Sequence, residues 1–169
     1  MPNLTDSGLP IRDDLTAAHA QAWDSMSKAG TWLTAERRVA VAAEVRQART
    51  CNLCQLQKEA LTPNSVSGTH TSLGLMTAGE VEAIHRMAAD PGRLSETLHG
   101  SIIAQGITPK ECIEIAGLVA ITVMADTFAF GIGVEETPLP PPQGGWPSNY
   151  QSPGAKAEAA WVPIIEPED

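Results

Sequence analysis

Basic residues are scarce in this sequence, and their shortage argues against two classes of partner. Eleven lysine and arginine residues stand against 20 aspartate and glutamate residues, and the formal net charge is −9. Proteins that bind nucleic acid or anionic membrane surfaces need a basic face. The sequence also has no uninterrupted apolar run of about 18–20 residues, the length of a membrane-spanning helix. We therefore expect a protein that binds neither nucleic acid nor membranes.

Aromatic residues and cysteines are also few. Aromatic residues make up 4% of the 169 residues, so the core must be formed by alanine, valine, isoleucine, leucine and methionine. Three cysteines are a low and odd number, which argues against a secreted disulfide framework. The first residues, Met-Pro-Asn-Leu-Thr-Asp-Ser, lack the basic and apolar segments of a signal peptide. We therefore expect a cytoplasmic protein.

Helix-start signals recur along the chain and predict an all-α fold of about six helices. Thr34 is expected to cap one helix, and Thr77 and Thr108 each precede a glutamate by three residues, the pattern of a capping box. No segment shows convincing strand alternation. Residues 113–123 are rich in β-branched side chains, but the strong cap and the length favour a buried helix. The expected helices cover residues 13–29, 34–49, 51–61, 77–88, 94–105 and 112–130.

The composition changes after Glu135. The run Glu-Glu-Thr-Pro-Leu-Pro-Pro-Pro-Gln-Gly-Gly predicts an extended, polyproline-like arm. Disordered tails rarely keep aromatic residues, yet this arm carries three of them. We therefore expect it to pack on its own domain or on a neighbouring subunit. The chain is divided into an N-terminal helical segment (1–30), a helical domain (31–135) and the arm (136–169), whose aromatic residues are Trp146, Tyr150 and Trp161.

Cys51 and Cys54 form a CxxC pair at a predicted helix start. Thiols at this spacing lie on one face of a helix, so they can close a disulfide or attack a substrate in turn. Glu44 lies seven residues before Cys51, two helical turns away. Its apolar neighbours favour a partly buried carboxylate suited to proton transfer. A plain surface glutamate is the alternative.

Two interpretations without redox chemistry stay open for the cysteines. The pair can be two buried small residues at a helix start. A zinc site needs four ligands, and the sequence has no second CxxC and no HxxxH pair to complete one. We therefore expect no metal and no other cofactor. Cys112, just inside a capped apolar helix, is expected to be packed in the core.

Two stretches carry a family resemblance. Residues 34–54 join a helix with acidic residues to the CxxC, and residues 107–135 form a long apolar helix ending in Gly-Ile-Gly-Val. They resemble the alkylhydroperoxidase D-like branch of the carboxymuconolactone decarboxylase superfamily, and in particular its alkylhydroperoxidase-related proteins. The resemblance implies an all-helical subunit and a proton relay of glutamate, two cysteines and histidine. It makes Cys54 the attacking thiol, Cys51 the resolving thiol and Glu44 the relay carboxylate, with Glu36 as its rival.

The chain departs from the family pattern at Lys58. The family has histidine four residues after the second cysteine, and a lysine cannot shuttle protons near neutral pH as an imidazole can. His85 is the most plausible substitute, although its helical spacing from Val81 and Ile84 also fits a core histidine. His70, in a polar loop, and His19, on an exposed-looking helix, are expected to be solvated.

Two functions from different classes follow from these patterns. The first is a thiol-dependent peroxidase or disulfide reductase acting on a peroxide or disulfide substrate. The alternative is a redox-silent member of the superfamily, either a small-molecule binder or a decarboxylase or isomerase that uses carboxylate and histidine. In both cases we expect a homo-oligomer, and the family resemblance implies a trimer or a hexamer. A helix at 112–130 that is apolar on nearly every side must be covered all round.

Overall fold

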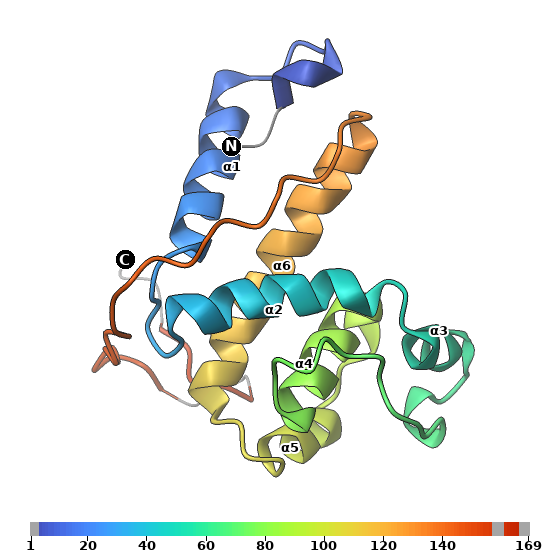
Figure 1. Ribbon diagram of the computed structural model, residues 1–169. Helices are drawn as coiled ribbons and strands as arrows, with labels where there is room; N and C mark the ends of the chain where they lie inside the picture. Colours follow the sequence, from blue (N-terminus) through green and yellow to red (C-terminus); the bar gives the residue numbers. More distant parts are fainter. Residues whose placement is uncertain (1–3, 157–160, 166–169) are drawn as a thin grey trace.

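The computed structural model describes residues 4–156 and 161–165, and within these ranges it is built from helices (Figure 1). The described residues form six α-helices and three short 3₁₀ turns, at Leu4–Ser7 before the first helix and at Pro63–Ser65 and Pro91–Arg93 between helices. One isolated antiparallel bridge joins Lys156 to Ile164. The expected all-α fold is confirmed. The helices are α1 (Asp13–Met26), α2 (Ala35–Ala48), α3 (Asn52–Glu59), α4 (Ala78–Ala89), α5 (Glu96–Ile103) and α6 (Pro109–Gly131).

The predicted caps place the helix starts correctly. The Thr34 hydroxyl accepts from the backbone N–H of Arg37 at 3.4 Å. Both capping boxes are complete, with Thr77 paired to Glu80 and Thr108 paired to Glu111. Each box satisfies backbone N–H groups that have no partner inside the helix. These local bonds set the registers of α2, α4 and α6, which carry most of the core.

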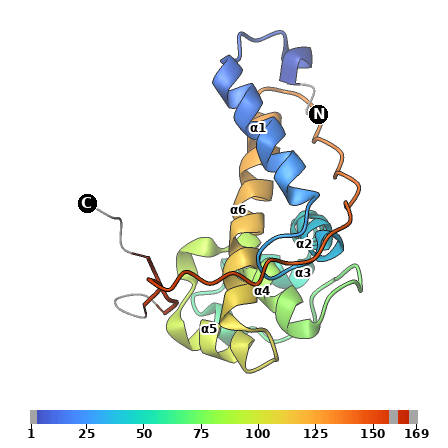
Figure 2. The ribbon, with the colours of Figure 1, turned by 90° about the vertical axis from the view of Figure 1, so that its left-hand side faces the viewer.

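The core lies where α2, α4 and α6 pack against one another in all three pairings. Val41, Ile84, Ile115 and Leu118 from these helices are buried in one hydrophobic cluster. Residues 113–123 are therefore part of a core helix, as expected. In Figures 1 and 2, α1 lies beside the C-terminal half of α6, on the other side of α2 from α4 and α5.

The helix α6 is not covered on every side within one chain. Ile113, Met124 and Phe130 are 43%, 52% and 85% exposed. Among the described residues α6 is also the one helix long and apolar enough, by length and composition, to cross a membrane, and 33% of its most apolar window is buried. The core helix of a soluble protein can have the same length and composition, and α6 contacts α1, α2 and α4. The expected absence of membrane binding stays a prediction.

The described part of the arm begins by packing on its own domain. The Trp23 indole N–H donates to the Pro138 carbonyl at 2.8 Å, and the backbone N–H of Gln143 donates to the Ser27 carbonyl at 2.7 Å. Figure 1 shows the arm descending along α1 and passing the start of α2. Its aromatic residues do not anchor it there, because Trp146 is 90% exposed and Tyr150 is 67% exposed. Contact with a neighbouring subunit stays a prediction.

Candidate functional site

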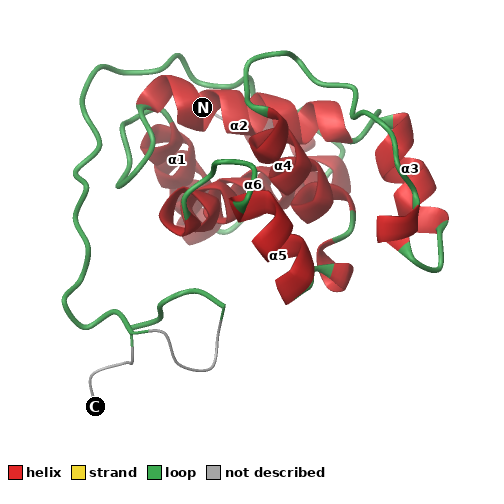
Figure 3. Cartoon of the chain, turned by 90° about the horizontal axis from the view of Figure 1, so that it is seen from below, coloured by secondary structure: helices red, strands yellow, loops and turns green. Residues whose placement is uncertain are grey.

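The CxxC pair lies at the junction of α2 and α3, at the edge of the molecule away from α1 (Figure 3). Cys51 is the N-cap residue of α3, with an extended backbone, and Cys54 is in the first turn. Both side chains are buried and both thiols are free. The two thiols are 3.7 Å apart. A disulfide bond is about 2.05 Å long, so closure of the ring requires only a small movement.

Glu44, His85 and Cys54 form a continuous chain of polar contacts between α2, α4 and α3. His85 Nδ1 is 3.2 Å from Cys54 Sγ, and His85 Nε2 is 2.9 Å from Glu44 Oε1. Both the histidine and the glutamate side chains are fully buried. An ionised carboxylate can only accept, so His85 donates from Nε2 and presents Nδ1 to the sulfur. Glu44 Oε2 also accepts from the backbone N–H of Leu73 at 3.1 Å.

His70 contacts the same two thiols from the loop between the Pro63–Ser65 turn and α4. The expectation that His70 is solvated is therefore wrong. His70 Nδ1 lies 3.4 Å from the sulfur atoms of both Cys51 and Cys54. Its Nε2 is 3.0 Å from Glu82 Oε2, and 6% of its side chain is exposed. The loop returns over the start of α3, where the backbone N–H of Thr71 donates to Cys51 Sγ at 3.4 Å. No motif or periodicity in the sequence of this polar loop predicts that it folds back over the start of α3.

Other residues singled out in the sequence lie outside this arrangement. Glu36 is exposed at the first turn of α2, eight residues before Glu44 and thus about 12 Å away along the helix axis. His19 is buried against the Phe128 ring, 4.8 Å between centroids, so the expectation of a solvated His19 is also wrong. Cys112 is buried in the main hydrophobic cluster, as expected.

The two imidazoles shift the acid–base properties of the thiols. Burial favours a neutral Cys51, but the Cys54 backbone N–H, His70 and the Thr71 N–H outweigh it and lower the pKa of Cys51 to about 6. Burial likewise opposes ionisation of Cys54, yet contacts with His70 and His85 lower its pKa. Burial disfavours charge on His70 too, while Cys54, Glu82 and Cys51 raise its pKa to about 10. The site therefore favours thiolates paired with imidazolium groups.

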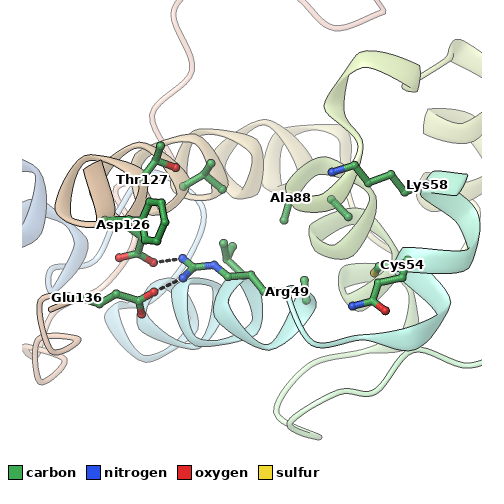
Figure 4. A pocket seen from close by; sticks show the side chains of 13 residues that line it. Arg49, Cys54, Lys58, Ala88, Asp126, Thr127 and Glu136 are labelled. Atoms are coloured by element: carbon green, nitrogen blue, oxygen red, sulfur yellow. Dashed lines mark hydrogen bonds and ion pairs between the residues drawn. The ribbon is translucent and has the colours of Figure 1, made fainter. Parts of the chain in front are cut away.

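A cavity of about 540 Å³ opens beside Cys54 (Figure 4). Its walls come from α2, α3, α4 and α6, and Val45, Ala48 and Ala88 make them largely apolar. Figure 4 shows Cys54 and Lys58 at one end, and Arg49 joined to Asp126 and Glu136 at the other. Cys54 lines this cavity and Cys51 does not. Of the two cysteines, Cys54 is therefore the one in contact with the cavity.

The four thiol and imidazole groups also form a candidate ligand set for a metal ion. The ligand atoms of Cys51, Cys54, His70 and His85 all lie within 4.8 Å of one another. The sequence-based ligand count missed this set because the two histidines are 15 residues apart and come from a loop and from α4.

Comparisons of the chain with known protein families, with curated proteins and with solved structures find no match. The resemblance to the alkylhydroperoxidase D-like proteins therefore rests on the motif residues alone, and the function has to be argued from the chemistry of the site.

Proposed function

We propose that the protein is a thiol–disulfide oxidoreductase that reduces a peroxide or a small disulfide. One observation carries the proposal: two free thiols 3.7 Å apart, in contact with two imidazoles that are each bonded to a carboxylate. Paired thiols allow two-electron chemistry, and imidazoles near neutral pH move the protons that accompany it. We assign His85 the role of the histidine that the family pattern puts at the position of Lys58, and its contacts with Cys54 and Glu44 support this assignment.

Cys54 is the thiol that attacks. As a thiolate it attacks the outer oxygen of a hydroperoxide, the O–O bond breaks, and Cys54 becomes a sulfenic acid. The alkoxide that leaves takes a proton from an imidazolium, His85 or His70. Both imidazoles are within reach, since Nδ1 of His85 is 3.2 Å and Nδ1 of His70 is 3.4 Å from Cys54 Sγ.

Cys51 is the thiol that resolves the sulfenic acid. Its thiolate attacks Cys54 Sγ, the S–S bond forms, and hydroxide leaves as water after taking a proton from the second imidazolium. The lowered pKa of Cys51 does not make it the attacking residue, because Cys54 lines the cavity and Cys51 does not. An external dithiol returns two electrons and two protons and restores both thiols. Glu44 and Glu82 hold the two rings in position throughout.

A stoichiometric oxidation experiment tests the proposal. Reduced protein treated with one equivalent of hydrogen peroxide should lose two hydrogens, located by mass spectrometry in the peptides containing Cys51 and Cys54. Free thiols should fall from three to one, with Cys112 as the internal control because it is buried in the core. Three remaining thiols, or oxidation of Cys112 alone, would favour the redox-silent alternative, in which the cavity binds a small molecule without thiol turnover.

We also propose that the chain assembles as a homo-oligomer, a trimer or a hexamer. The support is the set of apolar side chains that one chain leaves exposed on α6, namely Ile113, Met124 and Phe130. Phe130 also lines the cavity beside Cys54. A second copy packed against Phe130 would cover this end of α6 and part of the cavity mouth, and would exclude water from the thiols.

A further inference from the structure

We propose that the reduced site binds one Zn²⁺ ion, and that the ion and the Cys51–Cys54 disulfide exclude each other. The redox half of this inference rests on the proposed function, whereas the metal site itself does not. The ion would be held in a closed tetrahedral site made only of protein ligands. We call these ligands the Cys₂His₂ cluster: Cys51 Sγ, Cys54 Sγ, His70 Nδ1 and His85 Nδ1.

The spacing of the ligand atoms already approaches that of a zinc tetrahedron. Zn–S bonds of about 2.3 Å and Zn–N bonds of about 2.0–2.1 Å require S···S separations of about 3.8 Å and S···N separations of about 3.6 Å. The two thiols are 3.7 Å apart, and His70 Nδ1 is 3.4 Å from each sulfur. His85 Nδ1 is 3.2 Å from Cys54 Sγ. The remaining separations do not exceed 4.8 Å, so small movements would bring all four atoms to zinc-binding distance of one ion.

The groups behind the ligands also fit a metal site. Zinc-bound histidines usually donate their second ring N–H to a carboxylate, which sets the tautomer and the ring orientation. His70 Nε2 contacts Glu82 Oε2 at 3.0 Å, and His85 Nε2 contacts Glu44 Oε1 at 2.9 Å. Both rings thus direct Nδ1 at the thiols. The Thr71 N–H, 3.4 Å from Cys51 Sγ, supports the thiolate form.

Charge and burial favour zinc over the hard cations. Two thiolates and two neutral imidazoles offer soft and borderline ligands and no oxygen, whereas Ca²⁺ and Mg²⁺ prefer oxygen ligands. Two negative sulfur atoms balance one divalent ion inside a buried site. Because all four positions are protein ligands, no open position is left for a substrate.

The same sulfur atoms cannot serve both chemistries at once. Zinc holds Cys54 and blocks its attack on a peroxide, so the metal-bound form is protected against oxidation. Forced oxidation would release the metal: the two zinc-bound thiolates, one hydroperoxide and two protons give the disulfide, free Zn²⁺, an alcohol and water. The site would thus change between a zinc-bound and a disulfide state.

Metal titration of the full chain tests this inference. Reduced, metal-free protein is titrated with Zn²⁺ in competition with a chromophoric chelator, and with Co²⁺, whose absorption spectrum reports tetrahedral sulfur coordination. We expect one ion per chain for the reduced protein and none after disulfide formation. Glu82→Gln, which removes a carboxylate behind His70 but no ligand, should weaken zinc binding 10- to 100-fold. Glu36→Gln, at an exposed carboxylate on α2, should leave it unchanged.

His70→Ala is the decisive ligand variant because His70 comes from a loop and is not part of the main hydrophobic cluster. It should weaken Co²⁺ binding and change the cobalt spectrum, because water would have to take the fourth position, while far-UV circular dichroism stays native. A reduced protein that binds no zinc, or binds it equally well without His70, overturns the metal site. If the reduced protein binds no zinc but peroxide still closes the disulfide, the metal site is refuted and the proposed function stands. If zinc binds but peroxide never closes the disulfide, the exclusion and the proposed function both fail.

Discussion

Replacing Glu44 by glutamine should slow the oxidation of Cys54 about ten- to hundredfold. Glu44 is fully buried and its carboxylate accepts two hydrogen bonds, from His85 Nε2 at 2.9 Å and from the Leu73 backbone N–H at 3.1 Å. Glutamine has the same shape but one acceptor oxygen. Its amide N–H₂ must therefore face one of these two donors.

The size of the effect follows from the lost contact. A hydrogen bond to a charged group contributes about 1.5–3 kcal/mol. If His85 loses that bond, its ring is no longer held toward Cys54 and its imidazolium loses a counter-ion. A tenfold change in rate corresponds to about 1.4 kcal/mol, which gives the range of about ten- to hundredfold. The unsatisfied buried donor should also lower the free energy of unfolding by about 1–3 kcal/mol.

The assay is a quenched-flow oxidation of the metal-free protein. Reduced protein is mixed with hydrogen peroxide, quenched with a thiol-alkylating reagent, and its unreacted thiols are counted by intact mass. Glu36→Gln is the matched control, because it makes the same substitution on the same helix at an exposed position. The control should oxidise at the rate of the unaltered protein.

Equal rates for Glu44→Gln and the unaltered protein across pH would refute the reasoning and leave Glu44 a structural residue. Slow oxidation of the Glu36→Gln variant would instead favour Glu36 as the relay carboxylate. Urea denaturation of both variants separates a lost catalytic contact from a lost fold.

Four further outcomes are expected. Cys51→Ser should leave a sulfenic acid at Cys54 that a dimedone-type probe labels, and labelling at Cys51 in a Cys54→Ser variant instead would reverse the two roles. Cys112 should resist alkylation in the native state, because burial raises its pKa and keeps it neutral, and rapid labelling below pH 8 would contradict its place in the core. Light scattering should show a trimer or hexamer for the full chain, and a monomer would refute the assembly. A chain ending at Glu136 should melt at a lower temperature, since it loses the bond from Trp23 to the arm.

The sequence alone predicted the helices because their signals are local. The hydroxyls of Thr77 and Thr108 and the glutamates three residues later determine where α4 and α6 begin, whatever the rest of the chain does. The short CxxC spacing also predicted that Cys51 and Cys54 lie together, at the start of α3. These relations depend on residues within one or two turns of each other. The two-turn relation between Glu44 and Cys51 does not hold, because α2 ends at Ala48.

The tertiary structure decided which residues complete the site. His70 and Glu82 join the thiols because a polar loop folds back over α3, and no periodicity in the sequence encodes the path of that loop. The packing of α2 against α4 brings His85 within 2.9 Å of Glu44 across 41 residues, while Glu36 stays on the exposed first turn. Contacts between distant segments result from the packing of whole helix faces, so only the folded chain brings both histidines and both carboxylates to one pair of cysteines.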